Sequence, residues 1–210
     1  MPIPRSAVGH RPRVEGEREA QILDAALVLL SQVGYDRLTM DAVAAEAKAS
    51  KATLYRRWAT KATLVVDALL RTTKALQTPD VDAGSLREDL VQMACCHGGL
   101  TDERSAQVMA SIVTALHHDP DFAAEFRSRV LGPKIDVARQ IFERARARGE
   151  ITADLDLDLL SPALAGIILH RSFVLGLPAD EKTVARVVDE IIVPAATRAP
   201  AVPSESRGTS

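Results

Sequence analysis

Residues 39–64 read TMDAVAAEAKASKATLYRRWATKATL, and this stretch predicts two short helices joined by a tight turn. Thr39 suits the N-cap of the first helix, because its side-chain oxygen can accept a hydrogen bond from a free amide of the first turn. Val43, Ala44 and Ala47 recur at helical spacing. One face of this helix can therefore be buried.

The second helix is predicted over residues 51–57, after the connection Ala47-Lys48-Ala49 and a second N-cap at Ser50. Ala52 and Thr53 are small, so backbone amides at the start of the helix can closely approach phosphates or base edges. The end of the helix is aromatic and basic, with Tyr55, Arg56 and Arg57. This pattern is typical of a helix-turn-helix, whose second helix enters the DNA major groove.

The composition favours an all-helical protein with one or two domains. The 210 residues are 47% hydrophobic but only 3% aromatic, and β-branched runs at strand spacing are absent. Net charge is −2 overall, but residues 1–75 hold 12 Lys and Arg against 8 Asp and Glu, while residues 76–210 hold 14 against 20. A basic amino-terminal head on an acidic body suits a DNA-binding head with a body of different function.

The head resembles the amino-terminal domain of the TetR family of transcriptional regulators. The resemblance covers about the first third of the chain and rests on residues 22–26, 34–35, 39–44, 50–58 and Lys61. Ala49 departs from the family pattern, which often has Gly there, and is tolerated if the backbone at that position avoids the left-handed region. Arg57-Trp58 also departs from it, because His or Tyr followed by an aromatic residue is common there, so one phosphate contact is expected to differ.

The resemblance implies an all-α fold of about nine helices. In this fold an amino-terminal three-helix helix-turn-helix DNA-binding domain is followed by a helical ligand-binding and dimerisation domain. We expect a flexible basic arm at 1–15, the DNA-binding domain at 16–62, the body at 63–198 and a disordered tail at 199–210. Arg5, Arg11 and Arg13 of the arm either touch DNA or belong to a tail of no consequence.

The helices are predicted from apolar periodicity and from Gly and Pro positions. The first runs from Glu17 to Val33 and ends at Gly34, and Thr60 caps another that residues 78–80 break. A kink is expected at Gly132-Pro133, because Pro clashes with the preceding helical turn. Further helices are predicted over 85–97, over 102–117 with Val108, Ile112, Val113 and Leu116 facing inward, and over 120–148, 154–176 and 181–198.

The last two predicted helices are apolar around much of their circumference and need more cover than one small body offers. The resemblance implies that they form a four-helix dimer interface with a second copy, and the alternative is that both are internal core.

The DNA-binding residues are expected to be Thr39, Ser50, Lys51, Ala52, Thr53, Tyr55, Arg56 and Lys61. Thr53 and Lys51 should face base edges or adjacent phosphates, while Tyr55, Arg56 and Lys61 should hold the DNA backbone.

The resemblance also implies a ligand pocket among the body helices. Candidates for its lining are Leu90, Met93, Met109, Ile112, Val113, Leu116, Ile135 and Phe173, with His97 or Arg139 as a polar handle. Each of these residues is alternatively plain core. We expect the ligand to be a small apolar or amphipathic molecule.

Catalytic motifs such as GxSxG, HExxH and the Walker loop are absent from the sequence. His117-His118-Asp119 is a poor metal site, because adjacent helical histidines point in different directions. Cys95 and Cys96 are interpreted as small buried helix residues. We therefore expect no catalytic residue, metal or cofactor. With no signal peptide and no apolar run near 18 residues, we expect a cytoplasmic protein without a membrane partner.

Two functions remain open at this stage. The first is a homodimeric, sequence-specific transcriptional regulator, namely a repressor that a small-molecule effector releases from double-stranded operator DNA. The alternative is a helical small-molecule-binding protein or enzyme whose head no longer binds DNA. The basic and small residues kept together in residues 50–61 favour the regulator.

Overall fold

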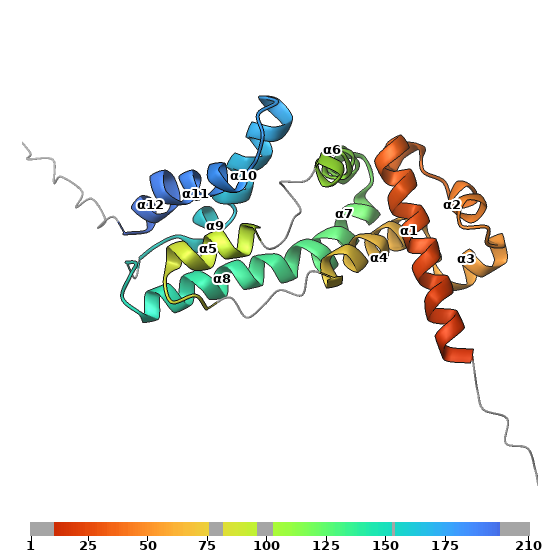
Figure 1. Cartoon of the computed structure of the whole chain (residues 1–210), viewed down its shortest axis with the longest axis horizontal. Coiled ribbons are helices and arrows are strands. Elements are labelled where there is room, and N and C mark those ends of the chain that lie inside the picture. Colours follow the sequence, from red (N-terminus) through yellow and green to blue (C-terminus); the bar gives the residue numbers. More distant parts are fainter. Residues whose placement is uncertain (1–10, 76–81, 96–102, 153, 198–210) are drawn as a thin grey trace, which may run out of the picture. The chain divides into compact units, whose positions relative to one another are not determined.

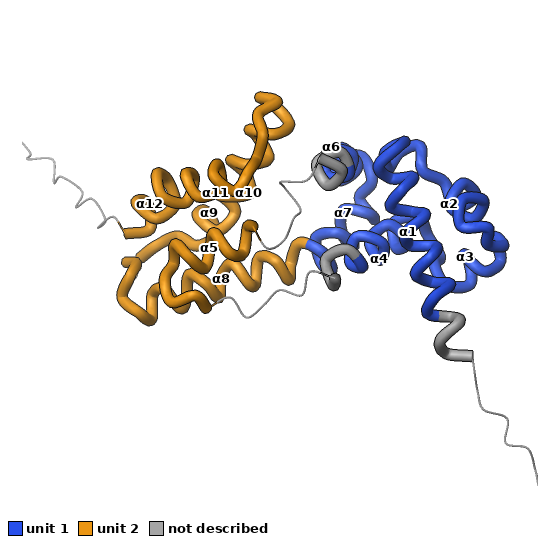
Figure 2. The backbone as a smooth tube through the Cα atoms, in the orientation of Figure 1, with its two compact units in different colours: residues 1–75, 107–130 blue, residues 76–106, 131–210 orange. Residues whose placement is uncertain are grey.

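The computed structural model describes residues 11–75, 82–95, 103–152 and 154–197, and all regular structure in these ranges is helical. The all-α prediction is confirmed. The chain forms two compact units, one from residues 1–75 and 107–130 and the other from residues 76–106 and 131–210 (Figure 2). The predicted tail at 199–210, the predicted break at 78–80 and residues 97–99 lie outside the described ranges.

The helices follow one another in the order labelled in Figure 1. The first unit contains α1 Arg11–Arg37, α2 Met40–Glu46, α3 Lys51–Arg57, α4 Lys61–Ala75, most of α6 Glu103–His118, α7 Pro120–Phe126 and the π-helical turn η1 Arg127–Leu131 up to residue 130. The second contains α5 Leu86–Cys95, α8 Gly132–Ala147, α9 Leu157–Leu160, α10 Ala163–Leu169, η2 His170–Val174, α11 Glu181–Val187, η3 Val188–Ile192 and α12 Val193–Thr197. When directly consecutive pieces are counted together, and α9 is counted with α10 across the two-residue turn between them, the described residues form nine helices, as predicted.

Helix α1 begins earlier than predicted. Its first residue is Arg11 instead of Glu17, so the last third of the expected flexible arm is helical. Pro12 fits there, because the amides of a first helical turn have no intrahelical partner to lose. Gly34 interrupts the helix with φ 76° and ψ 169°, which confirms the predicted stop. The left-handed region is open to Gly without a steric penalty.

Both predicted caps of the helix-turn-helix are present. Thr39 Oγ1 accepts a hydrogen bond from the amide of Ala42 at 3.2 Å, and Ser50 Oγ accepts one from the amide of Thr53 at 3.1 Å. Helix α3 has the predicted bounds. Thr60 likewise caps α4 by accepting from the amide of Thr63 at 3.2 Å.

The turn between α2 and α3 places Lys48, not Ala49, in the left-handed region, with φ 51°. The amide of Ala49 donates to the Ala44 carbonyl at 2.8 Å, and the amide of Lys48 donates to the Ala45 carbonyl at 3.0 Å. These two bonds form a Schellman motif, which usually has Gly at the left-handed position. The absence of Gly at residue 49 is thus accommodated, and the strain falls one residue earlier.

Substitutions at Lys48 should reveal this strain. Lys48→Gly is expected to leave the free energy of unfolding unchanged or to raise it by up to about 1 kcal/mol, because relief of the left-handed backbone outweighs the added chain entropy. Lys48→Val should lower it by about 1–3 kcal/mol, since a β-branched side chain fits this region poorly. Urea denaturation measures both. Equal stability of the two variants would contradict a left-handed residue 48.

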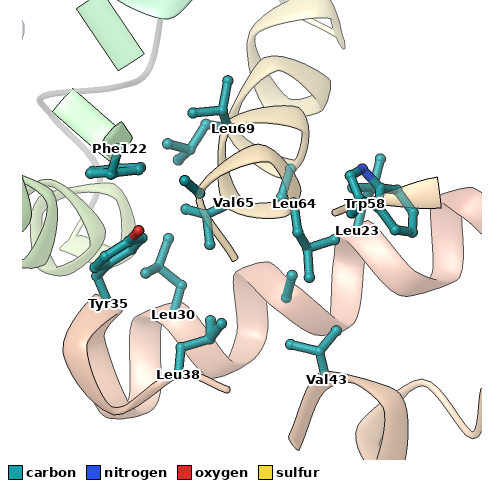
Figure 3. Packing of buried hydrophobic residues seen from close by; sticks show 14 of the residues in the cluster. Leu23, Leu30, Tyr35, Leu38, Val43, Trp58, Leu64, Val65, Leu69 and Phe122 are labelled. Carbon is teal, nitrogen blue, oxygen red and sulfur yellow. The ribbon is translucent and has the colours of Figure 1, made fainter. Parts of the chain in front are cut away.

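The core of the first unit joins the head to residues 107–130. Its buried residues include members of α1, α2, α3, α4, α6, α7 and η1. Figure 3 shows Trp58, Leu23 and Leu64 at one end of the cluster with Tyr35 and Phe122 at the other. The Tyr35 and Phe122 rings lie 4.2 Å apart between centroids. The division of the chain therefore differs from the predicted boundary at residue 62, because α4 and α7 pack with the head.

Tyr35 also holds the start of α7. Its hydroxyl donates to Asp119 Oδ2 at 2.7 Å, and Asp119 Oδ1 caps α7 by accepting from the Phe122 amide at 2.9 Å. These two bonds, with the Phe122 amide contributing most, lower the pKa of Asp119 below 3.8. The stability that Asp119 contributes is therefore fully present above pH 3.8 and is lost as the pH falls further.

Three details of the remaining helices correct the predictions. Val113 is 50% exposed instead of inward, because the buried stripe of α6 passes through its neighbour Ile112 and through Ala115. The helix predicted from Asp154 begins at Leu157, because Asp156 accepts from the amides of Asp158 and Leu159 and so caps it. Near Gly132-Pro133 the predicted irregularity is the π-helical turn η1, which lies directly before these two residues.

The carboxyl-terminal helices leave apolar side chains uncovered within the chain. Leu159 is 75% exposed, Val174 69% and Ile191 46%.

The prediction that no apolar run reaches the length of a membrane span is wrong for one stretch of these helices. Residues 157–174 form an 18-residue helical stretch that is long and apolar enough to cross a membrane, and only 17% of it is buried inside the chain. In the structure a turn at Ser161-Pro162 divides the stretch.

Candidate nucleic-acid interface

Helix α3 has one buried face and one exposed face. Leu54 is fully buried in the core of the first unit and anchors the helix. Lys51, Ala52 and Arg56 are exposed on α3, and Tyr55 is 53% exposed. An exposed aromatic ring on a soluble protein is informative when basic groups surround it, since Tyr and Arg both hydrogen-bond phosphates. The face thus presents groups that suit a DNA backbone.

Lys51 forms a weak, exposed ion pair beside this face. Its Nζ donates to Asp41 Oδ2 of α2 at 2.6 Å, and the two side chains are 66% and 56% exposed. The hydrogen bond from Lys51 to Asp41 raises the pKa of the lysine, so the ammonium stays charged at neutral pH. Exposed pairs of this kind hold their side chains weakly. Lys51 is therefore free to exchange Asp41 for a phosphate or a base edge.

The remaining predicted DNA-binding residues have structural partners in the chain. Thr39 and Ser50 are the two caps, and Thr53 Oγ1 lies 2.8 Å from Ser50 Oγ. Lys61 donates to the Tyr35 carbonyl at 3.0 Å, and its Nζ lies 4.1 Å from the centre of the Tyr35 ring. Lys61 is thus partly engaged in holding α4 to the end of α1.

Two contacts that support the helix-turn-helix were not predicted from the sequence. The Arg18 guanidinium of α1 donates to the carbonyl of Lys48, the strained residue of the turn. Arg57 of α3 forms an ion pair with Glu19 of α1 at 3.1 Å. Both pairs join residues about 30 or more positions apart, so local spacing gave no signal for them.

Comparison with known proteins agrees with this geometry. The sequence model described as "Bacterial regulatory proteins, tetR family" matches residues 22–68, and that described as "Tetracyclin repressor-like, C-terminal domain" matches residues 80–191. The chain belongs to the TetR family. Its resemblance to the family is therefore confirmed over both the head and the body, and the protein is a DNA-binding transcriptional regulator instead of an enzyme.

Several relatives share most of their length with this TetR-family chain. An uncharacterized HTH-type transcriptional regulator of Mycobacterium tuberculosis is 34% identical over 86% of this chain and 89% of its own. The DNA-binding transcriptional repressor TetR of Mycobacteroides abscessus is 32% identical over 84% of this chain and 92% of its own. The solved TetR family transcription regulator SCO0332 is 28% identical, with a TM-score of 0.64 over 84% of this chain and 97% of its own.

The candidate ligand residues of this TetR-family chain fall into both units. Met109, Ile112, Val113 and Leu116 belong to the first unit, where Ile112 is buried and Met109 and Leu116 pack against the core. In the second unit, Leu90 is buried, Met93 packs against the core, Ile135 is 41% exposed and Phe173 is 37% exposed. Arg139 pairs with Asp158 at 2.6 Å, and His97 lies outside the described residues.

Proposed function

We propose that this TetR-family regulator is a homodimeric, sequence-specific repressor that acts in the cytoplasm. The observation that carries the proposal is the outer face of α3, where Lys51, Tyr55 and Arg56 surround the small residue Ala52. Small residues at the start of a recognition helix permit close approach to base edges, and the basic and phenolic groups contact phosphates. The name of the Mycobacteroides abscessus relative supports repression as the direction of control.

Two heads are needed because one short recognition helix reads few bases. Heads about 34–36 Å apart would enter successive major grooves on one face of B-DNA. The exposed apolar residues of α9, η2 and η3, including Leu159, Val174 and Ile191, supply a surface that a second copy would cover. Large exposed apolar patches on a soluble protein mark interaction sites of this kind.

A small apolar or amphipathic effector is proposed to release the dimer from operator DNA. The match of residues 80–191 to a tetracyclin repressor-like carboxyl-terminal domain supports this proposal. The candidate lining residues are Leu90, Met93, His97, Met109, Ile112, Val113, Leu116, Ile135, Arg139 and Phe173. Such a ligand acts only through a higher affinity for a dimer whose heads are misaligned.

Substitutions on the outer face of α3 test the DNA-binding role. Lys51→Ala and Tyr55→Phe are expected to weaken binding to a duplex that the wild-type protein enriches from a random-sequence pool. Loss of a phosphate contact by Lys51 should reduce the salt slope by about one unit and weaken all sequences alike. Loss of a base contact should instead cost about 1–3 kcal/mol and relax specificity.

The matched control is Arg87→Gln, which removes one positive charge from an exposed ion pair with Asp189 in the second unit. Its affinity and salt slope should equal those of the wild type. Fluorescence anisotropy at several salt concentrations measures all three variants. Unchanged affinity and slope for both α3 variants would show that this face does not contact DNA.

A further inference from the structure

Asp67 of α4 accepts hydrogen bonds from two residues that belong to different elements. Its Oδ2 accepts from the Trp58 indole Nε1 at 2.8 Å, and its Oδ1 accepts from the Arg129 guanidinium at 2.5 Å. The Asp67 side chain is only 17% exposed. A carboxylate shielded from water attracts a cation more strongly than one in bulk solvent. Asp67 therefore joins α4 both to the end of α3, through Trp58, and to η1, through Arg129.

Trp58 lies at the carboxyl end of the recognition helix. It is the C-cap residue of α3, and its backbone amide donates to the Leu54 carbonyl at 2.8 Å. The side chain is 2% exposed and lies beside Leu23 and Leu64 in the core, as Figure 3 shows. The indole at the end of α3 is therefore fixed both by packing and by Asp67.

Arg129 lies in η1, the π-helical turn through which the chain leaves the first unit. Residue 130 is the last of the first unit, and residue 131 begins the second. Arg129 also forms an ion pair with Glu125, one turn earlier, at 3.2 Å. The hydrogen bond to Asp67 is the main cause that raises the pKa of Arg129. π-Helical turns inside longer helices are frequent at functional sites.

We propose that Asp67 and Arg129 are positioning residues for DNA binding, which fix the end of the recognition helix to the π-helical turn that leads into the ligand-binding body. The inference rests on the proposed DNA-binding function and names the contacts by which the body would act on α3. Neither residue needs to touch DNA. Their effect passes through the Trp58 indole.

A neighbouring pair on the same helix provides a matched control. Arg71 of α4 pairs with Asp24 of α1 at 3.1 Å, but its partner is 60% exposed and neither residue contacts α3 in a described bond. Both pairs and Trp58 line the same open cavity on the first unit. Arg71→Gln therefore removes the same charge from the same surface without loosening Trp58.

The test compares Arg129→Gln, Asp67→Asn and Arg71→Gln in the full-length protein, on a duplex that the wild type enriches from a random-sequence pool. Arg129→Gln and Asp67→Asn are both expected to weaken binding roughly 2- to 30-fold, the range for residues of a coupling network. Their salt slopes should match the wild type, because no phosphate contact is lost. Trp58 is the only tryptophan, so its emission maximum reports the indole directly and should shift in these two variants alone.

The two substitutions change charge in opposite directions, which separates positioning from simple electrostatics. Long-range charge effects predict that Arg129→Gln weakens and Asp67→Asn tightens binding to the DNA polyanion. Positioning predicts that both substitutions weaken binding. It also predicts that the double variant binds DNA no more weakly than whichever single variant binds it more weakly. Three results would overturn the positioning role alone, provided that the wild type binds DNA. The two substitutions could change the affinity in opposite directions, their effects on affinity could add, or the Trp58 emission maximum could stay unchanged. A wild type that enriches no duplex would instead overturn the proposed function, and this inference with it.

Discussion

Gly166→Glu is expected to convert the proposed dimer to monomers while leaving each chain folded. Gly166 lies on an exposed face of α10, and beyond its chain neighbours and the adjacent helix backbone a Cβ added there meets no atom within 4 Å. Replacing Gly inside a helix should even stabilise the single chain by roughly 0.5–1 kcal/mol through reduced chain entropy. In the proposed dimer the new carboxylate would be buried against a second copy without a partner, which is strongly unfavourable.

The same change should lower operator affinity by about 10²–10⁴-fold, because two linked heads gain that much over one head through effective concentration. Sedimentation equilibrium at micromolar concentration measures the mass, and anisotropy on the selected duplex measures the affinity. Ile191→Glu, at a residue 46% exposed in η3, should act in the same way.

Ile168→Glu is the matched control for a failure to fold. Ile168 lies two residues from Gly166 but is fully buried in the core of the second unit. A charge there is expected to unfold the unit, with loss of the helical circular-dichroism signal. A dimeric Gly166→Glu variant, or a monomeric wild type, would show that the carboxyl-terminal helices are not the interface.

The helix-turn-helix was predictable because its signals are local. Thr39, Ser50 and Thr60 each lie three residues before the amide that they cap, so sequence spacing is enough to place them. Gly34 and Gly149 mark helix ends by the same reasoning, and both have positive φ in the structure. Caps and glycine stops depend on a few neighbouring residues and carry little tertiary information.

Contacts between distant segments were not predictable in this way. Tyr35 and Asp119 are 84 positions apart, and their hydrogen bond helps to join residues 107–130 to the head. Asp67 did leave a signal, since a carboxylate between the buried residues Val66 and Ala68 requires partners. Apolar spacing could not identify these partners, Trp58 and Arg129, because it describes one helix at a time.

The exposed residues of the body show a second limit. Val113 and Ile112 are adjacent and equally apolar, yet one is 50% exposed and the other 1%. Hydropathy cannot predict which of two such neighbours is buried when the helix has apolar residues along more than one stripe. The ligand-binding assignments share this limit, because core and pocket residues have the same composition.

A buried carboxylate in the second unit should make that unit sensitive to the loss of a single cation. Asp89 is fully buried, accepts from the Ala83 amide at 2.6 Å and pairs with the Arg148 guanidinium at 3.2 Å. Arg148 also contacts Glu150, and Glu150 accepts from the Leu86 amide at 2.7 Å. The group therefore fixes the start of α5 to the end of α8, where Gly149 closes the helix with φ 75°.

The pKa of Glu150 shows that these bonds outweigh the cost of burial. Burial alone would raise this pKa, but the Leu86 amide and Arg148 lower it below the ordinary value of 4.5. Its contribution to stability is thus fully present above pH 4.5 and is lost as the pH falls through the lower pKa of the folded state. Acid should therefore loosen the junction of α5 and α8.

Arg148→Ala is expected to lower the free energy of unfolding by about 3–5 kcal/mol at neutral pH, because it leaves the buried Asp89 carboxylate without its cation. Asp89→Ala should cost a similar amount, since it removes the acceptor of the Ala83 amide as well as the ion pair. For a chain of this size, each 1 kcal/mol corresponds to about 2–4 °C in melting temperature. Urea and thermal denaturation, at one fixed protein concentration, measure these changes.

The double variant Asp89→Ala with Arg148→Ala distinguishes the stability that the ion pair contributes from the stability that each residue contributes through its other contacts. If the cost of Arg148→Ala arises from a stranded charge, adding Asp89→Ala removes that charge, and the double variant should be no less stable than the worse single variant. Arg87→Gln at the exposed pair with Asp189 is the control and should have the same melting temperature as the wild type. Fully additive losses would mean that Arg148 stabilises the second unit through its other contacts and that Asp89 tolerates burial without it.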